Sequence, residues 1–164
     1  MSSGARIKKH PIHAMLIPFP IALWIFSLVA DLFYVLGLGG FIWKDIAFYA
    51  LVGGLIGGLA AAIPGYLDYR SLTDKATMRL GWWHLMVNLT VVGLSALNVL
   101  LRWNEGHDAA VPVFLSVIAV GMLAVSGWLG GEMVYVHGAG VERPRVKTEP
   151  ETEKPRRKAA GGLP

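Results

Sequence analysis

The sequence contains no cysteine and few charged residues. Among its 164 residues, 16% are Asp, Glu, Lys or Arg, whereas 54% are hydrophobic. The missing cysteines exclude disulfides, thiolate zinc sites, cysteine-bound iron–sulfur clusters and covalently attached haem. Any metal site must therefore use His, Asp, Glu or Met. Of the 15 basic and 11 acidic residues, 11 fall within residues 141–164, so residues 1–140 carry too little charge for a water-soluble domain.

What the chain has instead is long apolar segments. A membrane helix needs about 20 mostly apolar residues, and four such segments predict transmembrane helices at residues 14–37, 46–67, 81–101 and 111–136. The predicted fold class is all-α, an integral membrane four-helix bundle formed by residues 10–140. Residues 1–9 form a basic N-terminal arm. Residues 141–164 contain four prolines and no aromatic residue, which predicts a disordered C-terminal tail.

The basic residues predict an orientation, because cytoplasmic loops of membrane proteins carry an excess of Lys and Arg. Of the 15 basic residues, 13 precede the first span, lie between the second and third spans, or follow the fourth. Both termini are therefore expected to be cytoplasmic, with the bundle in the inner membrane. On this interpretation the net charge of +4 reflects topology. No basic helix with interleaved aromatic residues predicts a nucleic-acid partner.

Glycines and prolines mark places of close packing or irregular backbone. The second and fourth spans carry small residues at intervals of three or four: Gly53, Gly54, Gly57, Gly58, Gly127 and Gly131. Such spacing favours close helix packing, and a slot for a flat cofactor is the alternative. Pro18 and Pro20 predict a bend early in the first span, and Pro64 predicts one at the end of the second.

Four of the five histidines are predicted near the cytoplasmic boundary: His10, His13, His84 and His137. Imidazole is a common metal ligand and an axial ligand of haem. The four therefore predict a site for haem b or for a transition-metal ion such as Fe, Cu or Zn. His10 and His13 share one helix face, so a haem would take one ligand from them and the other from His84 or His137. Each histidine taken alone is more simply an interfacial residue with local hydrogen bonds.

Other polar residues are predicted to support this site. Asn88 follows His84 by one turn and would orient its imidazole. Asp68 would hold a histidine tautomer, and Arg70 and Arg79 would pair with haem propionates. Glu132 is expected about 7.5 Å deeper in the membrane than the last of the four histidines. Because polar groups are costly inside a membrane, their gathering at one face favours a functional site.

Asp31 is predicted to lie far from the histidines. It is eighteen residues beyond the second of them, which is about 27 Å along a straight helix, and so lies near the outer face. One interpretation is that Asp31 pairs with Lys44 or Arg102, and the other is that it marks the far end of a proton path. Asn98 and Ser95 are interpreted as interhelical hydrogen bonds.

These residues together resemble a known family. The motifs are the His10-Pro11-Ile12-His13 start, Asp31, Pro64-Gly65, His84 with Asn88, and the Gly127-Trp128-Leu129-Gly130-Gly131-Glu132 close. From His10 to Val141 the chain resembles the bacterial and archaeal membrane family known as domain of unknown function 2231. The resemblance implies a membrane topology and no settled activity. Some relatives are joined to a Rieske-type iron–sulfur domain, which implies redox partners. This chain has no cysteine for such a domain, so a separate cytoplasmic redox protein is expected.

Three functions remain open at the level of sequence. The first is a redox or electron-transfer membrane subunit that holds haem or a metal ion at the histidines. The second is a transporter or permeability protein for a metal ion or small solute, with Asp31, Glu132 and the histidines as its pathway and a homo-oligomer to provide the size. The third is a structural subunit of a membrane complex with no cofactor. No hydrolytic or phosphotransfer motif is present.

Overall fold

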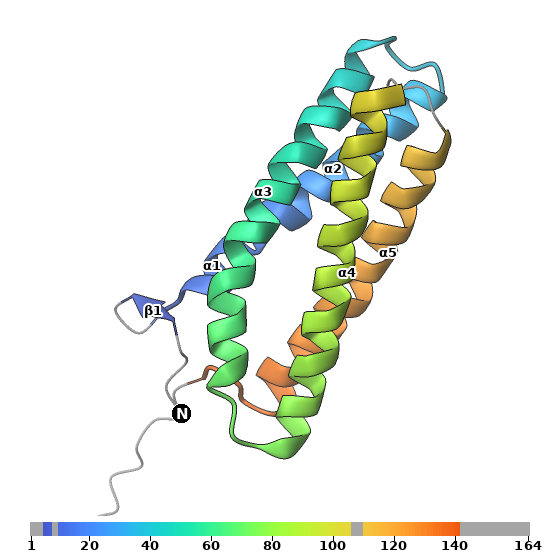
Figure 1. Ribbon diagram of the computed structural model, residues 1–164. Coiled ribbons are helices and arrows are strands. Elements are labelled where there is room, and N and C mark those ends of the chain that lie inside the picture. The colour runs from blue at the N-terminus through green and yellow to red at the C-terminus, as the bar shows by residue number, and fades with distance from the viewer. Residues whose placement is uncertain (1–4, 8–9, 106–109, 142–164) are drawn as a thin grey trace, which may run out of the picture.

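The chain forms a bundle of long helices that run alternately up and down (Figure 1). The computed structural model describes residues 5–7, 10–105 and 110–141. Its elements are β1 Arg6–Ile7, β2 His10–Pro11, α1 Ile12–Leu16, α2 Pro18–Val35, α3 Ile42–Arg70, α4 Lys75–Glu105, α5 Ala110–Gly131 and the π-helix η1 Glu132–Val136. Lys8 and Lys9 of the predicted arm, the fifth histidine His107, and residues 142–164 of the predicted tail lie outside the described residues.

Four segments are long and apolar enough to cross a membrane, which confirms the predicted all-α bundle with four spans. They are Ile12–Val35, Ile42–Arg70, Lys75–Asn104 and Ala110–Val136. The third differs most from its prediction, since α4 begins well before the apolar residues do. The reason is a capping residue: Asp74 Oδ2 accepts bonds from the Thr77 N–H at 2.9 Å and from the Thr77 hydroxyl at 2.7 Å. The predicted orientation of the termini stays a prediction.

Irregular backbone gathers at one end of the bundle. The first span breaks between α1 and α2 at Ile17, immediately before Pro18, as the sequence predicts. Pro64 lies inside α3 near its C-terminal end. The fourth span ends in the π-helix η1, where the His137 N–H bonds to the Glu132 carbonyl at 3.2 Å. Figure 1 shows α1, η1, the β hairpin and the α3–α4 turn at this same end, which we call the histidine end.

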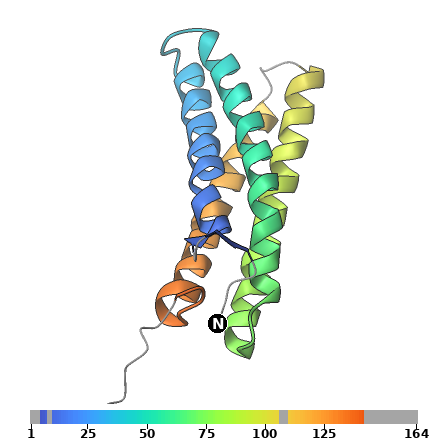
Figure 2. The same cartoon turned by 90° about the vertical axis from the view of Figure 1, so that its left-hand side faces the viewer.

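The helices pack mainly in two pairs. α3 packs most extensively against α2, and α4 packs most extensively against α5. Figure 2 shows α2 beside α3 from the side. The glycines of α3 explain the first pairing, because a Cβ at Gly53 would lie 3.2 Å from Leu23 and one at Gly57 would lie 3.3 Å from Pro20. Close packing is therefore the role of these glycines on α3.

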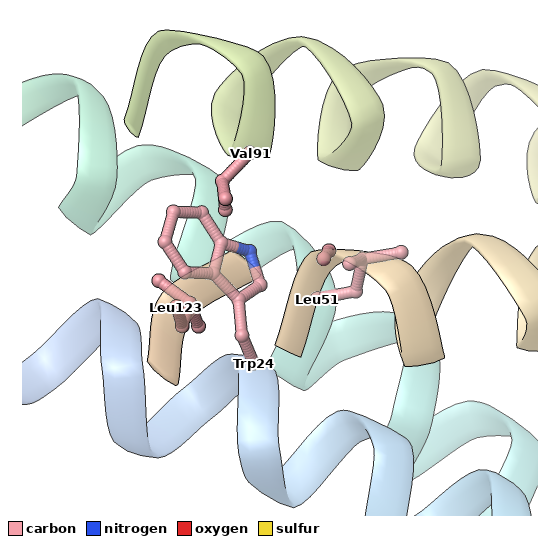
Figure 3. Packing of buried hydrophobic residues seen from close by; sticks show 5 residues of the cluster. Trp24, Leu51, Val91 and Leu123 are labelled. Carbon is pink, nitrogen blue, oxygen red and sulfur yellow. The ribbon is translucent and has the colours of Figure 1, made fainter. Parts of the chain in front are cut away.

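A small apolar cluster fills the middle of the bundle: Trp24, Leu51, Val91, Ala119 and Leu123 (Figure 3). The Trp24 indole lies flat along α3, since a Cβ at Gly54 or Gly58 would approach its ring atoms to 2.7 Å or 2.6 Å. The other four residues come from α3, α4 and α5, so all four spans contribute to the cluster. The cluster therefore divides the interior of the bundle into two halves.

The half away from the histidines is closed by a buried ion pair, and we call this the arginine end. Arg102 Nη1 and Nη2 donate to the two carboxylate oxygens of Asp31 at 2.8 and 2.6 Å, and both side chains are at most 5% exposed. Arg102 Nε also donates to Asn98 Oδ1 at 2.9 Å. Asn98 Nδ2 in turn donates to the Pro112 carbonyl and the Ser116 hydroxyl, both at 2.9 Å. The predicted pairing of Asp31 with Arg102 and the interhelical role of Asn98 are thus confirmed.

Lys44 and Ser95 are also buried, and the hydrogen bonds around Arg102 described above involve neither of them. The ammonium group of Lys44 is largely buried and lies 4.3 Å from the centre of the Tyr34 ring and 4.8 Å from that of Phe41. Ser95 was expected to bond across helices, but its Oγ is buried without a hydrogen-bond partner among the described residues. The expectation for Ser95 is therefore wrong, because no polar atom of a facing helix lies within hydrogen-bond reach of this Oγ among the described residues.

Candidate functional site

A cavity of about 1500 Å³ opens at the histidine end of the bundle. Its walls come from α1, α2, α3, α4 and the segment from Met133 to Val141. Trp24, Gly58 and Val92 mark its deepest part, and the α3–α4 turn with Thr73 and Asp74 lies at its mouth. The bends at Ile17 and Pro64 and the π-helix therefore surround the one large cavity found among the described residues.

His13 enters this cavity from α1 and is held by the backbone of α3. Its Nδ1 lies 2.9 Å from the Ala61 carbonyl oxygen. A carbonyl only accepts, so Nδ1 carries the proton and the lone pair of the neutral ring lies on Nε2. A Cβ at Gly65 would approach the His13 ring to 2.8 Å, so glycine is needed there. Pro64, just before it, cannot donate a hydrogen bond to its own helix and loosens α3 at this level.

His84 enters the same cavity from α4 and is held in the same way by α5. Its Nδ1 lies 3.0 Å from the Ser126 carbonyl oxygen. By the same argument Nδ1–H is the donor and Nε2 carries the lone pair. A Cβ at Gly130, one turn after Ser126, would lie 3.3 Å from the ring. The two histidines thus share one arrangement: a fixed tautomer, a backbone carbonyl as partner and a glycine facing the ring.

The two imidazoles face each other across the bundle. Their ring centres are 6.4 Å apart and their planes are at 89° to each other. The sequence alone offered four pairings of a first-span histidine with His84 or His137. The structure brings together His13 and His84, because His13 lies on α1 and lines the cavity, whereas His10 lies on β2 and is exposed. The predicted shared helix face of His10 and His13 is therefore wrong, since the helix begins only at Ile12.

Asn88 and Ser126 form a small network beneath His84. Asn88 Nδ2 donates to the His84 carbonyl at 2.7 Å and to Ser126 Oγ at 2.6 Å. Ser126 Oγ lies 3.2 Å from His84 Nδ1. Asn88 therefore reaches the imidazole through Ser126 rather than directly. Sequence reasoning missed Ser126, although its place one turn before Gly130 on a helix facing α4 was a usable signal.

The remaining predicted site residues are scattered around the mouth. Asp68 lines the cavity, but its Oδ1 accepts a bond from the Ala5 N–H at 3.2 Å and so ties down the N-terminal hairpin. His137 is half-buried and also lines the cavity. The others do not line it: exposed His10 on β2, exposed Arg70 and Arg79, and half-buried Glu132. In the part of the chain that the structure describes, no three His, Asp or Glu residues are grouped so as to hold a metal ion.

Asp74 at the mouth was not singled out by the sequence. The Thr77 N–H and hydroxyl both donate to its carboxylate, and they lower the pKa of Asp74 below its ordinary value of 3.8. The nearby charge of His137 lowers this pKa further. The mouth of the cavity therefore keeps a carboxylate that is ionised at neutral pH, on the α3–α4 turn opposite the segment that follows η1.

A family model described as a predicted membrane protein (DUF2231) matches residues 9–143. The chain belongs to the DUF2231 family. The match includes every residue that lines the cavity and all four DUF2231 spans. No curated protein and no solved structure matches the chain. The protein is thus a predicted DUF2231 integral membrane protein that would lie in a lipid bilayer.

Proposed function

We propose that this DUF2231 protein binds one haem b in the cavity at the histidine end, where His13 and His84 would hold its iron, and that it serves as a membrane electron-transfer subunit. The observation that carries the proposal is the pair of facing imidazoles, each fixed through Nδ1 to a backbone carbonyl. The other observations bear on whether these residues suit a haem.

The separation of the two rings supports a shared metal atom. Imidazole nitrogens bind metals at about 2.0–2.1 Å. Two imidazoles on opposite sides of one metal therefore have ring centres roughly 6 Å apart, whereas two at a tetrahedral angle are roughly 5 Å apart. The observed 6.4 Å matches the first arrangement. His13 and His84 would therefore be the residues that hold the haem iron, since one metal atom fits between rings at this separation.

The hydrogen bonds of the two rings also suit metal ligands. A histidine that binds a metal commonly donates its other ring N–H to a carbonyl or carboxylate, which fixes the tautomer and the ring orientation. His13 and His84 both do this, with Ala61 and Ser126. Gly65 and Gly130 also leave room for these two rings on the helices that they pack against. A histidine that only lies at the membrane interface would not require a glycine on the neighbouring helix.

The rest of the cavity suits a large, mostly apolar group. Its volume of about 1500 Å³ exceeds the 300–1,000 Å³ of ordinary ligand pockets. Pro20, Trp24, Leu85 and Leu89 give the inner walls a largely apolar surface, into which His13, His84 and Asn88 bring polar groups. Arg70 and Arg79 do not line the cavity, so they are not expected to pair with the haem propionates. His137 is the lining residue at the mouth that would carry a positive charge when protonated.

A haem held by these two histidines would supply one-electron transfer. The chain itself would hold and orient the two ligands through Ala61, Ser126 and Asn88. The Trp24 cluster would keep water from entering from the arginine end. In this proposal the histidine end faces the cytoplasm, and a separate cytoplasmic redox protein is the electron partner. Both ligands come from one chain, so the site needs no homo-oligomer.

The transport alternative has less support. A pathway through the bundle would have to pass the Trp24 cluster and then the Asp31–Arg102 pair, and both fill the interior beyond the cavity. A bare metal ion would have two histidines within reach of each other and no third His, Asp or Glu grouped with them among the described residues.

The test is an absorption spectrum of detergent-purified protein, oxidised and reduced, combined with metal analysis. We expect a Soret band and about one haem per chain, lost in His13→Ala and in His84→Ala. His10→Ala is the matched control, because this histidine lies outside the cavity lining, and it should keep the haem.

Two outcomes would overturn the proposal. One is a wild-type protein, expressed with ample haem, that shows no Soret band. The other is a haem that persists in both alanine variants. Stoichiometric Fe, Cu or Zn without a Soret band would favour the bare ion instead.

A further inference from the structure

Three basic side chains surround the α3–α4 turn at the histidine end (Figure 1). Arg70 is the last residue of α3, Lys75 is the first residue of α4, and Arg79 lies one turn further along α4. All three are exposed. No hydrogen bond or ion pair joins these side chains to the residues that the structure describes. Their positive charge is therefore available to a partner from outside the chain.

The two acidic residues of this segment do not pair with the basic side chains. Asp68 accepts a bond from the Ala5 N–H at 3.2 Å. Asp74 accepts bonds from the N–H and the hydroxyl of Thr77 at 2.9 and 2.7 Å. Both carboxylates are thus bonded to N–H or O–H donors of the chain itself. The complement that the basic side chains require is a negatively charged group on another molecule.

Arg70 and Arg79 lie at one edge of a surface that faces the lipid. Tyr66, Leu67 and Trp82 all line one apolar hollow on the outer side of α3 and α4. Arg70 follows Tyr66 by four residues and Leu67 by three, and Arg79 precedes Trp82 by three. Residues three or four apart share a helix face. Each arginine therefore lies one turn beyond the hollow, toward the end of its own span.

The aromatic residues beside the arginines mark the level of the lipid headgroups. Tyr66, Trp82 and Trp83 are each about half exposed. Exposed Tyr and Trp gather where the hydrocarbon meets the headgroups, and basic side chains at the ends of spans extend to the same level. The two arginines are at the ends of the spans Ile42–Arg70 and Lys75–Asn104. A partner that contacts both arginines thus has its negative group at headgroup depth.

The two helices are packed closely together at this level. The rings of Tyr69 and Trp82 have their centres 6.5 Å apart. A Cβ at Gly81 would lie 3.0 Å from the side chains of both Tyr69 and Leu72. The end of α3 and the turn therefore pack directly onto the start of α4. The basic side chains of both helices are consequently presented to a single partner.

We propose that the α3–α4 turn binds an anionic phospholipid, whose phosphate contacts Arg70 and Arg79 and whose acyl chains lie along the apolar residues of the same helix faces. Basic side chains gathered between membrane helices are a general means of holding anionic headgroups. The positive charge selects this lipid over zwitterionic phosphatidylcholine. The headgroup depth favours a lipid over a soluble acidic protein. The inference is independent of the proposed haem, because neither arginine lines the cavity.

The experiment is native mass spectrometry of the full chain in detergent, titrated with palmitoyl-oleoyl phosphatidylglycerol and, separately, with phosphatidylcholine of the same acyl chains. A basic residue near an anionic lipid surface contributes roughly fivefold to binding. We therefore expect the first phosphatidylglycerol to bind about twentyfold more tightly than the first phosphatidylcholine. The double variant Arg70→Gln with Arg79→Gln should lower this preference about tenfold.

Two further double variants serve as controls. Arg156→Gln with Arg157→Gln removes the same charge from outside the described residues and should keep the preference. Arg70→Lys with Arg79→Lys retains the charge and should keep most of it, which separates a lost charge from a disturbed fold. Inorganic phosphate at millimolar concentration should not displace the lipid, since it has no acyl chains.

Three outcomes would overturn the inference. The first is equal affinity of the wild-type chain for the two lipids. The second is an equal loss of preference in the two glutamine variants, which would make the effect one of overall charge. The third is displacement of the lipid by inorganic phosphate. A peptide of ten glutamates that binds through the same arginines, without any preference between the lipids, would identify the turn as a protein-binding surface instead.

Discussion

The two ends of this bundle treat buried polar groups in opposite ways. At the arginine end, Asp31, Arg102, Asn98 and Ser116 satisfy one another without an intervening cavity. At the histidine end, His13 and His84 each bond a backbone carbonyl through Nδ1 and line a large cavity. Polar groups that bond only to one another hold helices together, as at the arginine end. Polar groups that line a cavity can also contact a ligand, as at the histidine end. The contrast is the reason that the proposed site is placed at the histidine end.

The middle of the bundle keeps the two ends apart. Trp24 lines the deepest part of the cavity and also belongs to the apolar cluster with Leu51, Val91 and Leu123. The three irregular places of the backbone, at Ile17, Pro64 and η1, all lie on the histidine side, near the cavity. A helix that must make room for a ligand departs from regular packing, and one that only holds its neighbours does not.

The largest expected effect is at the arginine end. Arg102→Met would leave the Asp31 carboxylate buried without a partner, and we expect the free energy of unfolding to fall by about 3–5 kcal/mol. SDS titration of the protein in mixed micelles measures it. The double variant Asp31→Leu with Arg102→Met should recover most of the loss, because no isolated charge remains. A single variant as stable as wild type would show that this pair does not hold the bundle.

The next effect is at the histidine end. Gly65→Ala places a Cβ 2.8 Å from the His13 ring, and we expect a loss of about 1–3 kcal/mol in stability with a lower haem content. Gly127→Ala is the control, since nothing lies within 4 Å of its added Cβ, and it should stabilise by about 0.5–1 kcal/mol. Equal effects of the two variants on haem content would count against His13 as a ligand.

A smaller effect is expected below His84. Ser126→Ala removes the 2.6 Å bond from Asn88 but keeps the backbone carbonyl that holds the imidazole. We expect a loss of about 1 kcal/mol in stability and a retained Soret band. Thermal unfolding and the absorption spectrum, measured on one preparation, check both parts. Loss of the haem in this variant would mean that the hydroxyl, and not the carbonyl, holds His84.

Ser95→Ala should change stability by less than about 0.5 kcal/mol, because its Oγ has no partner among the described residues. Ser116→Ala at the arginine end should cost about 1 kcal/mol, since that hydroxyl accepts a bond from Asn98. The two serines are matched in chemistry and burial. A Ser95 variant that loses as much stability as the Ser116 variant would reveal a hydrogen bond that the described residues do not supply.

The smallest effect is a pH dependence at the cavity mouth. The pKa of Asp74 is lowered in the folded protein, so its contribution to stability is fully present above the ordinary pKa of 3.8 and is lost as the pH falls through the lowered value. Melting temperatures of wild type and Asp74→Ala, measured from pH 7 to pH 3, should differ at neutral pH and converge in acid. Parallel curves would show that the cap on α4 does not depend on this carboxylate.

Much of the fold follows from the sequence because a membrane imposes it. Apolar length gives the four spans, and proline gives the break at Ile17 and the loosened helix at Pro64. The start of α4 was missed, since a capping Asp74 extends a helix beyond its apolar residues and hydropathy does not register caps. Ser126 was missed because its decisive group is a backbone carbonyl, which every residue has.

The sequence by itself determined that this chain belongs in a bilayer, and it predicted that most of its scarce polar residues, four histidines among them, gather at one face of the membrane. The tertiary structure decided which groups meet: His13 with His84 rather than His10 with His137, and Asp31 with Arg102. The physical reason is rotation. Sequence spacing fixes how deep a side chain lies along its helix, but the packing of glycine faces against Trp24 and the imidazoles sets how each helix turns toward its neighbours.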